Sequence, residues 1–457
     1  MAIAWLLLLA GAVVVYHRLT PKAQIPWLLL LSYAFYAWWA WHFLPLLAGL
    51  TLVTYAIAAR IAVWPRDDRR RRRWLLAGVA ANVAALALLR YGFRSAPFAS
   101  PFAVLGISFY ALQAIAYLLD TYSGALRTRP PFAHFALYLA YFPKIVAGPI
   151  ERPNAFLAQL AQPRPVDDER LARAATLIAV GLTRKLLIAD PLAQQIPAAT
   201  FTDPASFGTL ALWAAMFGYV FVLYNDFAGY TSIARGVSGL FGIELSPNFA
   251  VPFAAESFTD LWNRWHITFS HWLRDYIYMP LSRALLRRRL SRANLANLIL
   301  PPLVTMLVCG LWHGTSAHMV LWGGLHGVYL IAERSARLRW PPAPGSLAPA
   351  WRRRLGIATV FTLSVWAFVL LRLPTDQALA FWQELLSVRP GIPFEPRLVL
   401  FMIPSLWLDW MQLRYGEEVL FAHWPRPARV AALTVAVLLW LAMLGAVAPA
   451  SFVYQGF

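Results

Sequence analysis

Two histidine-glycine pairs lie inside stretches that are otherwise apolar enough to enter a bilayer. The first stretch, Val308 to Gly314, contains His313, and the second, Leu321 to Gly327, contains His326. An ionisable side chain in hydrocarbon is costly, and it usually faces a cavity or a partner. The adjacent glycines allow close backbone packing and leave room beside each imidazole. Both histidines are therefore candidates for chemistry, although hydrogen bonding between helices would also account for them.

A histidine in such a place can act as a general base. An imidazole with its ordinary pKa of about 6.5 suits proton abstraction from a hydroxyl group near neutral pH. Transfer of an acyl group from a thioester to an alcohol needs little beyond a base, an oxyanion donor and two oriented substrates. The indole N–H groups of Trp312 and Trp322 could be donors, or these rings could simply pack. Cys309 shares a helix face with His313, but buried free cysteines are usually inert.

The segment from residue 263 to 292 has the pattern of an amphipathic helix. Its aromatic stripe comprises Trp262, Trp265, Phe269, Trp272 and Tyr276, and its polar side carries Arg264, His266, Thr268, Ser270, His271, Arg274 and Asp275. The pattern predicts one helix that ends at Pro280 and lies in the membrane interface. Such a helix could line a reaction chamber, with His266, Arg264, Ser270 and Arg274 facing a substrate. For the aromatic stripe alone, we favour a membrane-surface anchor.

Three further charged residues interrupt apolar sequence. Asp226, in the run Tyr224 to Thr231, would need a buried partner. It could orient a histidine or a donor group, or pair with an arginine such as Arg264. Arg184 and Lys185 fall within the apolar run 174–190. They either extend towards the membrane interface or line an internal polar cavity.

The composition places the chain among polytopic membrane proteins. Hydrophobic residues make up 60% of the 457 residues and charged residues only 13%, whereas a soluble domain is about one quarter charged. We predict an all-α integral membrane protein with about 11 transmembrane helices plus re-entrant or interfacial helices. Residues 1–457 would form a single membrane domain, and the apolar Met1 to Tyr16 would be a retained first helix rather than a signal peptide.

The net charge of +19 does not indicate nucleic-acid binding, because the basic residues cluster in short loops between apolar runs. These basic loops lie near residues 18–22, 66–73, 127–129, 152–173, 283–292, 334–354 and 414–429. The opposite loops, 91–100, 191–206, 373–395 and 450–457, carry almost no basic charge. This asymmetry predicts cytoplasmic basic loops and external termini. A single cysteine excludes an intrachain disulfide, and no histidine pair has metal-ligand spacing, so we predict no metal site.

The chain resembles the membrane-bound O-acyltransferase (MBOAT) family, in particular its bacterial polysaccharide branch, which includes the alginate O-acetylation membrane subunit and the teichoic-acid D-alanyl transferase. The resemblance rests on motifs at Gly106 to Asp120, Tyr141 to Ile150, Asn225 to Ala234, Leu240 to Phe249 and Trp262 to Tyr278, and on both histidine-glycine pairs. It covers a core of about residues 101–335, between N-terminal helices (1–100) and C-terminal helices (336–457).

The resemblance implies a ring of helices around a thinned central funnel or tunnel, where a cytoplasmic acyl donor and an external acceptor meet. It implies that His313 is the catalytic base, and that His266 and His326 match other recurrent polar positions. It also implies an acetyl-CoA or acyl-carrier thioester as donor with no tightly bound cofactor, an envelope glycan as acceptor, and a periplasmic transferase as an additional partner. The basic run 283–292 would suit an acidic donor or simply anchor the chain.

The predicted function is therefore transfer of a small acyl group, most simply acetyl, towards hydroxyl groups of an envelope polysaccharide at the inner membrane. D-alanyl-type transfer from a carrier protein is an alternative. A transporter with proton-relay histidines is another, but repeated halves and paired intramembrane carboxylates are not evident. A third is a non-catalytic scaffold that presents an acyl donor to a soluble transferase.

Overall fold

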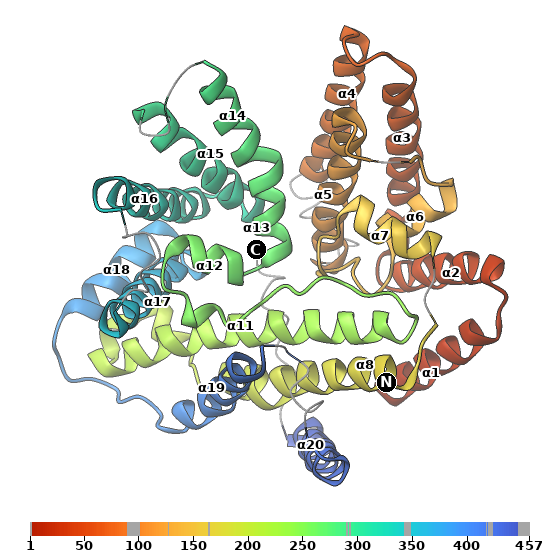
Figure 1. The fold of residues 1–457 in the computed structure, drawn as a ribbon. Coiled ribbons are helices and arrows are strands. Elements are labelled where there is room, and N and C mark those ends of the chain that lie inside the picture. Colours follow the sequence, from red (N-terminus) through yellow and green to blue (C-terminus); the bar gives the residue numbers. More distant parts are fainter. Residues whose placement is uncertain are drawn as a thin grey trace. The chain divides into compact units, whose positions relative to one another are not determined.

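The described part of the chain is built almost entirely of helices, which confirms the predicted all-α class (Figure 1). The computed structural model describes residues 2–88, 101–126, 128–162, 165–288, 291, 294–341, 349–416, 418 and 424–446. Within these ranges, the bridge between Phe207 and Ile392 is the only β-type pairing. The loops 91–100 and 450–457, Arg127 and part of the basic run 283–292 lie outside the described residues.

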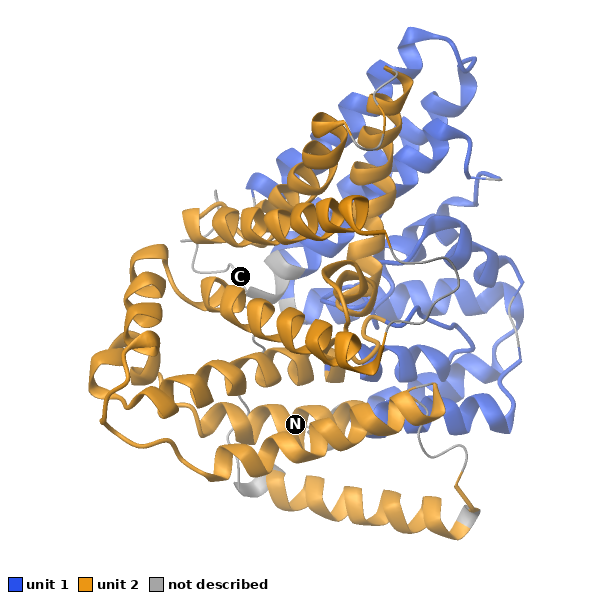
Figure 2. Ribbon diagram, turned by 60° about the vertical axis from the view of Figure 1, so that its left-hand side comes forward, with its two compact units in different colours: residues 1–179, 230–247 blue, residues 180–229, 248–457 orange. Residues whose placement is uncertain are grey.

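The helices pack as two compact units, one of residues 1–179 and 230–247 and the other of residues 180–229 and 248–457 (Figure 2). Unit 1 contains α1 (Ala2–Arg18), α2 (Pro21–Ala40), α3 (Leu44–Val63), α4 (Arg69–Ala87), α5 (Pro101–Ser123), α6 (Phe132–Ala140), α7 (Pro153–Ala161), most of α8 (Asp168–Leu182) and the end of α11 (Thr209–Gly239). Its helices α3, α4 and α5 pack against one another, and α2 packs against α6.

Unit 2 contains the candidate histidines. Its helices are α9 (Asp190–Gln194), α10 (Ala199–Thr202), α12 (Phe258–Arg264), α13 (Ile267–Leu273), α14 (Met279–Arg287), α15 (Leu295–His313), α16 (Ala317–Arg339), α17 (Ala350–Arg372), α18 (Thr375–Leu386), α19 (Arg397–Tyr415) and α20 (Arg426–Ala446), with the start of α11. Two π-helical segments, Thr183–Ala189 and Arg274–Tyr278, continue α8 and α13. The α15 and α16 pair makes the most extensive helix contact of the described structure.

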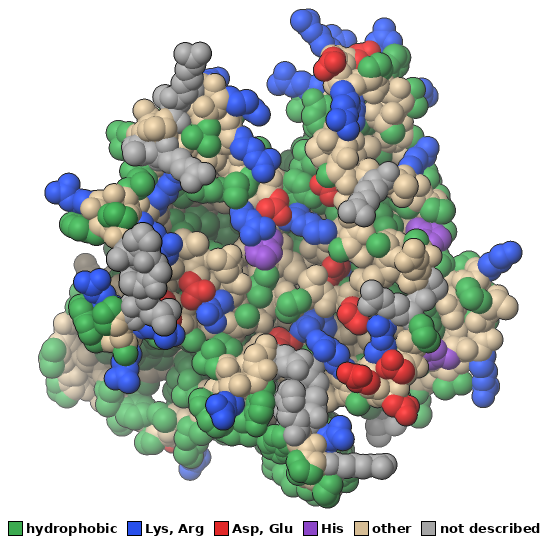
Figure 3. All heavy atoms as spheres, viewed as in Figure 1, with side chains coloured by type: hydrophobic (Ala, Val, Ile, Leu, Met, Phe, Trp, Pro, Cys, Tyr) green, Lys and Arg blue, Asp and Glu red, His purple; other side chains and the backbone are tan. Residues whose placement is uncertain are grey.

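Four of the described helices are long and apolar enough to cross a membrane. They are the helical stretches Trp41–Val63, Thr209–Gly239, Leu295–His313 and Ala350–Arg372. The predicted number of about 11 spans is therefore not confirmed and stays a prediction. In Figure 3 basic side chains gather at the turn between α3 and α4, where Arg66, Arg69 and Arg70 are exposed.

The prediction of one interfacial helix over residues 263–292 is wrong. Its aromatic sequence is divided between α12 and α13, because the backbone turns at His266, which has a left-handed φ of 43°. The helical backbone continues from the π-helical segment Arg274–Tyr278 into α14 (Met279–Arg287), so it does not end at Pro280 as we predicted. Trp265, Phe269 and Trp272 are buried inside the protein. The interpretation of the aromatic stripe as a membrane-surface anchor is therefore also wrong.

Candidate active site

His313 is the last residue of α15, and it lies buried among aromatic rings. The helix stops there because Gly314 is extended, although its N–H still donates to the carbonyl of Gly310 at 3.0 Å. The His313 ring lies edge-on to two indoles, with centroid distances of 4.8 Å to Trp312 and 5.1 Å to Trp322. The imidazole therefore occupies a low-dielectric environment in which rings limit its rotation.

Two glycines bring α15 and α16 into close contact beside His313. A Cβ atom on Gly310 would lie 2.3 Å from the carbonyl oxygen of Met319, and one on Gly323 would lie 2.3 Å from that of Met306. Real Cβ atoms do not approach backbone this closely, so only glycine permits this helix crossing. The crossing places Trp322, the neighbour of Gly323, against the His313 ring.

His326 lies one turn beyond Trp322 on α16 and is fully buried. Its ring centroid is 4.9 Å from that of Trp322 and 5.2 Å from that of Trp262 on α12. Phe368 of α17 closes another side, at 6.1 Å. His313 and His326 thus contact the same indole, so the two predicted histidines belong to one aromatic cluster.

His266 joins this cluster through other rings. Its imidazole lies 5.1 Å from Phe269 and 6.1 Å from Trp312, measured between ring centroids. Nδ1 is 3.2 Å from the side-chain oxygen of Asn248, which also accepts from the backbone N–H and the hydroxyl of Thr268. Burial lowers the pKa of His266 well below 6.5, and the nearby His313 lowers it further. The ring is therefore neutral near pH 7.

Several buried polar atoms in the cluster have no hydrogen-bond partner among the residues that the structure describes. They are both ring nitrogens of His326 and the indole nitrogens of Trp262 and Trp322. Unsatisfied buried polar atoms are uncommon and call for an explanation. A hydroxyl or carbonyl group of a substrate could hydrogen-bond with them, since an indole N–H donates and a neutral imidazole both donates and accepts.

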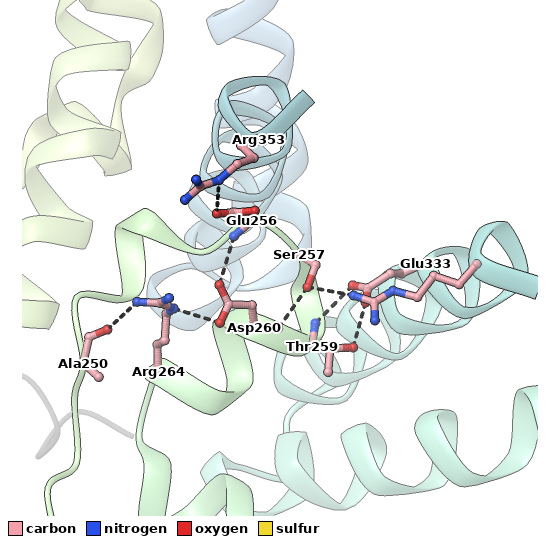
Figure 4. A network of polar contacts seen from close by, with 9 residues as sticks. Ala250, Glu256, Ser257, Thr259, Asp260, Arg264, Glu333 and Arg353 are labelled. Carbon is pink, nitrogen blue, oxygen red and sulfur yellow. Dashed lines mark hydrogen bonds and ion pairs between the residues drawn. The ribbon is translucent and has the colours of Figure 1, made fainter. Parts of the chain in front are cut away.

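The other predicted polar residues do not join this cluster in the contacts described. The guanidinium of Arg264 donates to Asp260 at 2.8 Å and to the carbonyl of Ala250 at 3.2 Å (Figure 4). The Ser270 hydroxyl is buried and donates to the backbone of Trp265 at 2.9 Å. Arg274 is exposed and pairs with its neighbour Asp275. Roles for these three residues in donor binding stay predictions.

Figure 4 shows that the contacts of Arg264 belong to a larger polar network around the start of α12. Ser257 caps this helix by accepting from the N–H of Asp260. Glu333 of α16 accepts from Thr259, and Arg353 of α17 pairs with Glu256. This network connects α12, α16 and α17, which also carry rings of the histidine cluster.

Asp226 does not pair with Arg264, which was one of the two roles that we considered for it. Its carboxylate is 2.8 Å from Nζ of Lys185, which also contacts Asp190 at 2.8 Å. The π-helical segment Thr183–Ala189 places Lys185 and Arg184 at this position, and π-helical turns are frequent at functional sites.

Arg184 takes part in a neighbouring buried set of polar contacts. Its guanidinium donates to Asp409 at 2.7 Å and to Asn225 at 2.9 Å. The Tyr224 hydroxyl donates to the same Asp409 oxygen at 2.8 Å. The two cations of the run 174–190 are thus neutralised by buried carboxylates, so Arg184 does not extend towards the membrane interface.

No three His, Cys, Asp or Glu side chains come together to form a candidate metal site in the described ranges. Sequence reasoning missed the roles of Asn248, which orients His266, and of Phe368, which packs on His326. Asn248 lies within a motif that we singled out, but nothing in its neighbourhood indicated a contact 18 residues along the chain.

The fold and the site define an all-helical protein with apolar spans and a buried histidine and indole cluster. The model of MBOAT, the membrane-bound O-acyltransferase family, matches residues 119–375, more than half of the chain. The chain belongs to this family, which confirms the resemblance seen in its motifs.

Curated relatives act on different envelope polymers, according to their names. A protein of Azotobacter vinelandii named probable alginate O-acetylase AlgI is 34% identical over 341 residues, which cover 70% of this chain and 65% of the relative. The peptidoglycan O-acetyltransferase of Helicobacter pylori is 31% identical over 359 residues, 70% of this chain and 65% of the relative. The teichoic acid D-alanyltransferase of Bacillus subtilis is 28% identical over 280 residues, 58% of this chain and 67% of the relative. The chain thus spans slightly less than two thirds of the length of the first two.

Proposed function

We propose that this chain is a membrane O-acyltransferase that moves a small acyl group, acetyl in the simplest case, from a thioester donor to hydroxyl groups of a cell-envelope polymer. Family membership and the names of the relatives support the reaction class. The observation that carries the site assignment is His313, buried at the end of α15 with its ring against Trp322.

In this mechanism His313 is the general base. Its neutral imidazole accepts the proton of the acceptor hydroxyl while the oxygen attacks the thioester carbonyl, which forms a tetrahedral intermediate. Collapse of the intermediate breaks the carbon–sulfur bond, and the imidazolium returns the proton to the leaving thiolate. The buried indole N–H of Trp322 is suited to donate to the carbonyl oxygen as negative charge develops on it.

His326 and His266 have supporting roles in this proposal. His326 also contacts Trp322, so it would hold that ring in the orientation that donates to the substrate. His266, held by Asn248, supplies a neutral ring beside Trp312. Because burial keeps His266 neutral near pH 7, this ring adds no positive charge that would repel an imidazolium at position 313.

The donor is acetyl-CoA or an acyl-carrier thioester on the cytoplasmic face, and the acceptor is an envelope glycan reached from outside, with a periplasmic transferase as a further partner. This arrangement places the chain in the inner membrane with both termini external, consistent with the distribution of basic loops. A D-alanyl donor is the second candidate, supported by the 28% identity to a protein named teichoic acid D-alanyltransferase.

The replacement His313→Ala tests the proposal against the transporter and scaffold alternatives. We expect loss of acyl transfer, measured as labelled acetyl on envelope polymers, with unchanged membrane insertion and unfolding temperature. The matched control is His318→Ala at the start of α16, whose ring contacts only the nearby Ser316 among the hydrogen bonds described. Full acyl transfer by the His313→Ala protein would refute the enzymatic role. Mass analysis of the envelope glycans would identify the group and the acceptor together.

A further inference from the structure

Unit 1 contains a cavity of about 60 Å³ that is lined by three arginines. Arg170 and Arg173 reach it from α8, and Arg235 reaches it from the end of α11. Among the described residues of the lining, Glu244 alone carries a carboxylate. Three guanidinium groups thus line a small hollow. None of these residues has a part in the acyl-transfer mechanism above.

Packing of α8 on α11 creates this cavity. A Cβ atom on Gly236 would lie 2.6 Å from the carbonyl oxygen of Ala174, so the two backbones touch at this point. The close crossing brings Arg235, next to Gly236, beside the α8 turn that carries Arg170 and Arg173. The Nε atom of Arg235 also donates to the carbonyl of Leu245 at 3.2 Å, which fixes that guanidinium in place.

Glu244 pairs only weakly with Arg170. The nearest atoms of Arg170 and Glu244 are 3.7 Å apart, and the Glu244 side chain is 58% exposed. Such a long and solvated ion pair contributes little. In addition, the Nη1 atom of Arg170 is buried and has no hydrogen-bond partner in the described part of the chain. An N–H group of a guanidinium is thus available at the cavity.

We propose that this cavity binds a phosphate group. A planar guanidinium matches the geometry of phosphate oxygens, and several guanidiniums around one site are the arrangement that proteins use for phosphate recognition. A cavity needs about 10–15 Å³ of such space to hold one water, so about 60 Å³ suits a small anion rather than a whole nucleotide. The remainder of the ligand would extend into solvent or lipid.

Two sources supply this chemistry, and an experiment separates them. One is the phosphate of a soluble nucleotide carrier such as coenzyme A, and the other is the headgroup of an anionic phospholipid. To test for a soluble phosphate, the full chain is placed in nanodiscs of phosphatidylcholine. The dissociation constants of coenzyme A and of its 3′-dephospho form are then measured by calorimetry. To test for a lipid headgroup, the unfolding temperature of the protein is compared between nanodiscs with and without phosphatidylglycerol. Neither measurement requires turnover, so the result is independent of the proposed acyl transfer.

The double replacement Arg170→Gln with Arg173→Gln should weaken phosphate binding about tenfold. Replacement Glu244→Gln should strengthen it about threefold, because it removes a negative charge from the lining. A gain of affinity cannot result from misfolding, so this variant keeps the test valid if the arginine variant is unstable. Arg72→Gln, at an exposed arginine of α4 in the same unit, is the control for a general loss of positive charge.

A response of coenzyme A binding to these variants would assign the site to a soluble phosphate, and loss of the stabilisation by phosphatidylglycerol would assign it to a lipid headgroup. Either result supports the proposal. If neither probe responds to the Arg170 and Arg173 replacements, or if Arg72→Gln has the same effect, the arginines only anchor the chain and the proposal is overturned.

Discussion

The glycine crossing beside His313 allows the link between packing and the proposed chemistry to be tested by adding a single methyl group. Replacement Gly323→Ala would place a Cβ atom 2.3 Å from the carbonyl oxygen of Met306, whereas ordinary contacts begin near 3.4 Å. The obstacle is backbone, which cannot rotate away as a side chain could. Helices α15 and α16 must therefore separate by about 1 Å, and the ring of Trp322 must move with α16.

A displacement of 1 Å at a reacting group can lower a rate about 100-fold. We expect this loss in the rate of acyl transfer, together with a destabilisation of about 1–3 kcal/mol from overpacking. The rate is measured with labelled acetyl donor on purified protein in nanodiscs, and stability is measured by denaturant unfolding of the same sample.

The next residue provides a matched control. A Cβ atom on Gly324 would meet only a side-chain carbon of Leu307, at 3.8 Å. Replacement Gly324→Ala should therefore keep full activity and stabilise α16 by up to about 1 kcal/mol, because alanine has the higher helix propensity. If Gly323→Ala retains activity within a few-fold of Gly324→Ala, the close crossing does not position the site and our reasoning is wrong.

Three more predictions follow from the described contacts. Replacement Arg184→Met should destabilise the protein by about 3–5 kcal/mol, because it leaves the buried Asp409 without its ion-pair partner. Replacement Arg353→Met, at an exposed ion pair, should lower the free energy of unfolding by less than about 1 kcal/mol. An equal loss of stability in the Arg184 and Arg353 variants would contradict this account. Burial lowers the pKa of His266 well below 6.5. As the pH falls towards 5.5, the His266 imidazole therefore binds a proton only in the unfolded state. His266 should therefore contribute about 1.4 kcal/mol to the stability lost between pH 7.5 and 5.5, and a His266→Asn variant that loses as much stability as the unchanged protein would contradict the assignment. Replacement Trp322→Phe keeps the ring but removes the indole N–H, so it should lower kcat about 100-fold if that group stabilises the oxyanion, and an unchanged kcat would exclude that role.

Local sequence properties determined the class of the protein. Long apolar runs with sparse charge predict a helical membrane protein. In lipid, unpaired backbone groups and charged side chains are costly, and this can be judged from the sequence without knowledge of tertiary contacts. The same argument selected His313 and His326, since an ionisable residue within an apolar run stands out without knowledge of its neighbours. Family motifs then indicated the reaction class.

The tertiary structure decided which residues meet. Asp226 pairs with Lys185, 41 residues earlier in the chain, rather than with Arg264. The continuous stripe predicted for residues 263–292 is divided at His266, where contacts with Asn248 accompany a left-handed backbone that helix periodicity does not reveal. The distance between two helices likewise depends on whether both carry glycine at the crossing, as Gly310 and Gly323 do. Such pairings join residues far apart in the chain, and their energies depend on close packing in three dimensions, so no local pattern of residue types specifies them.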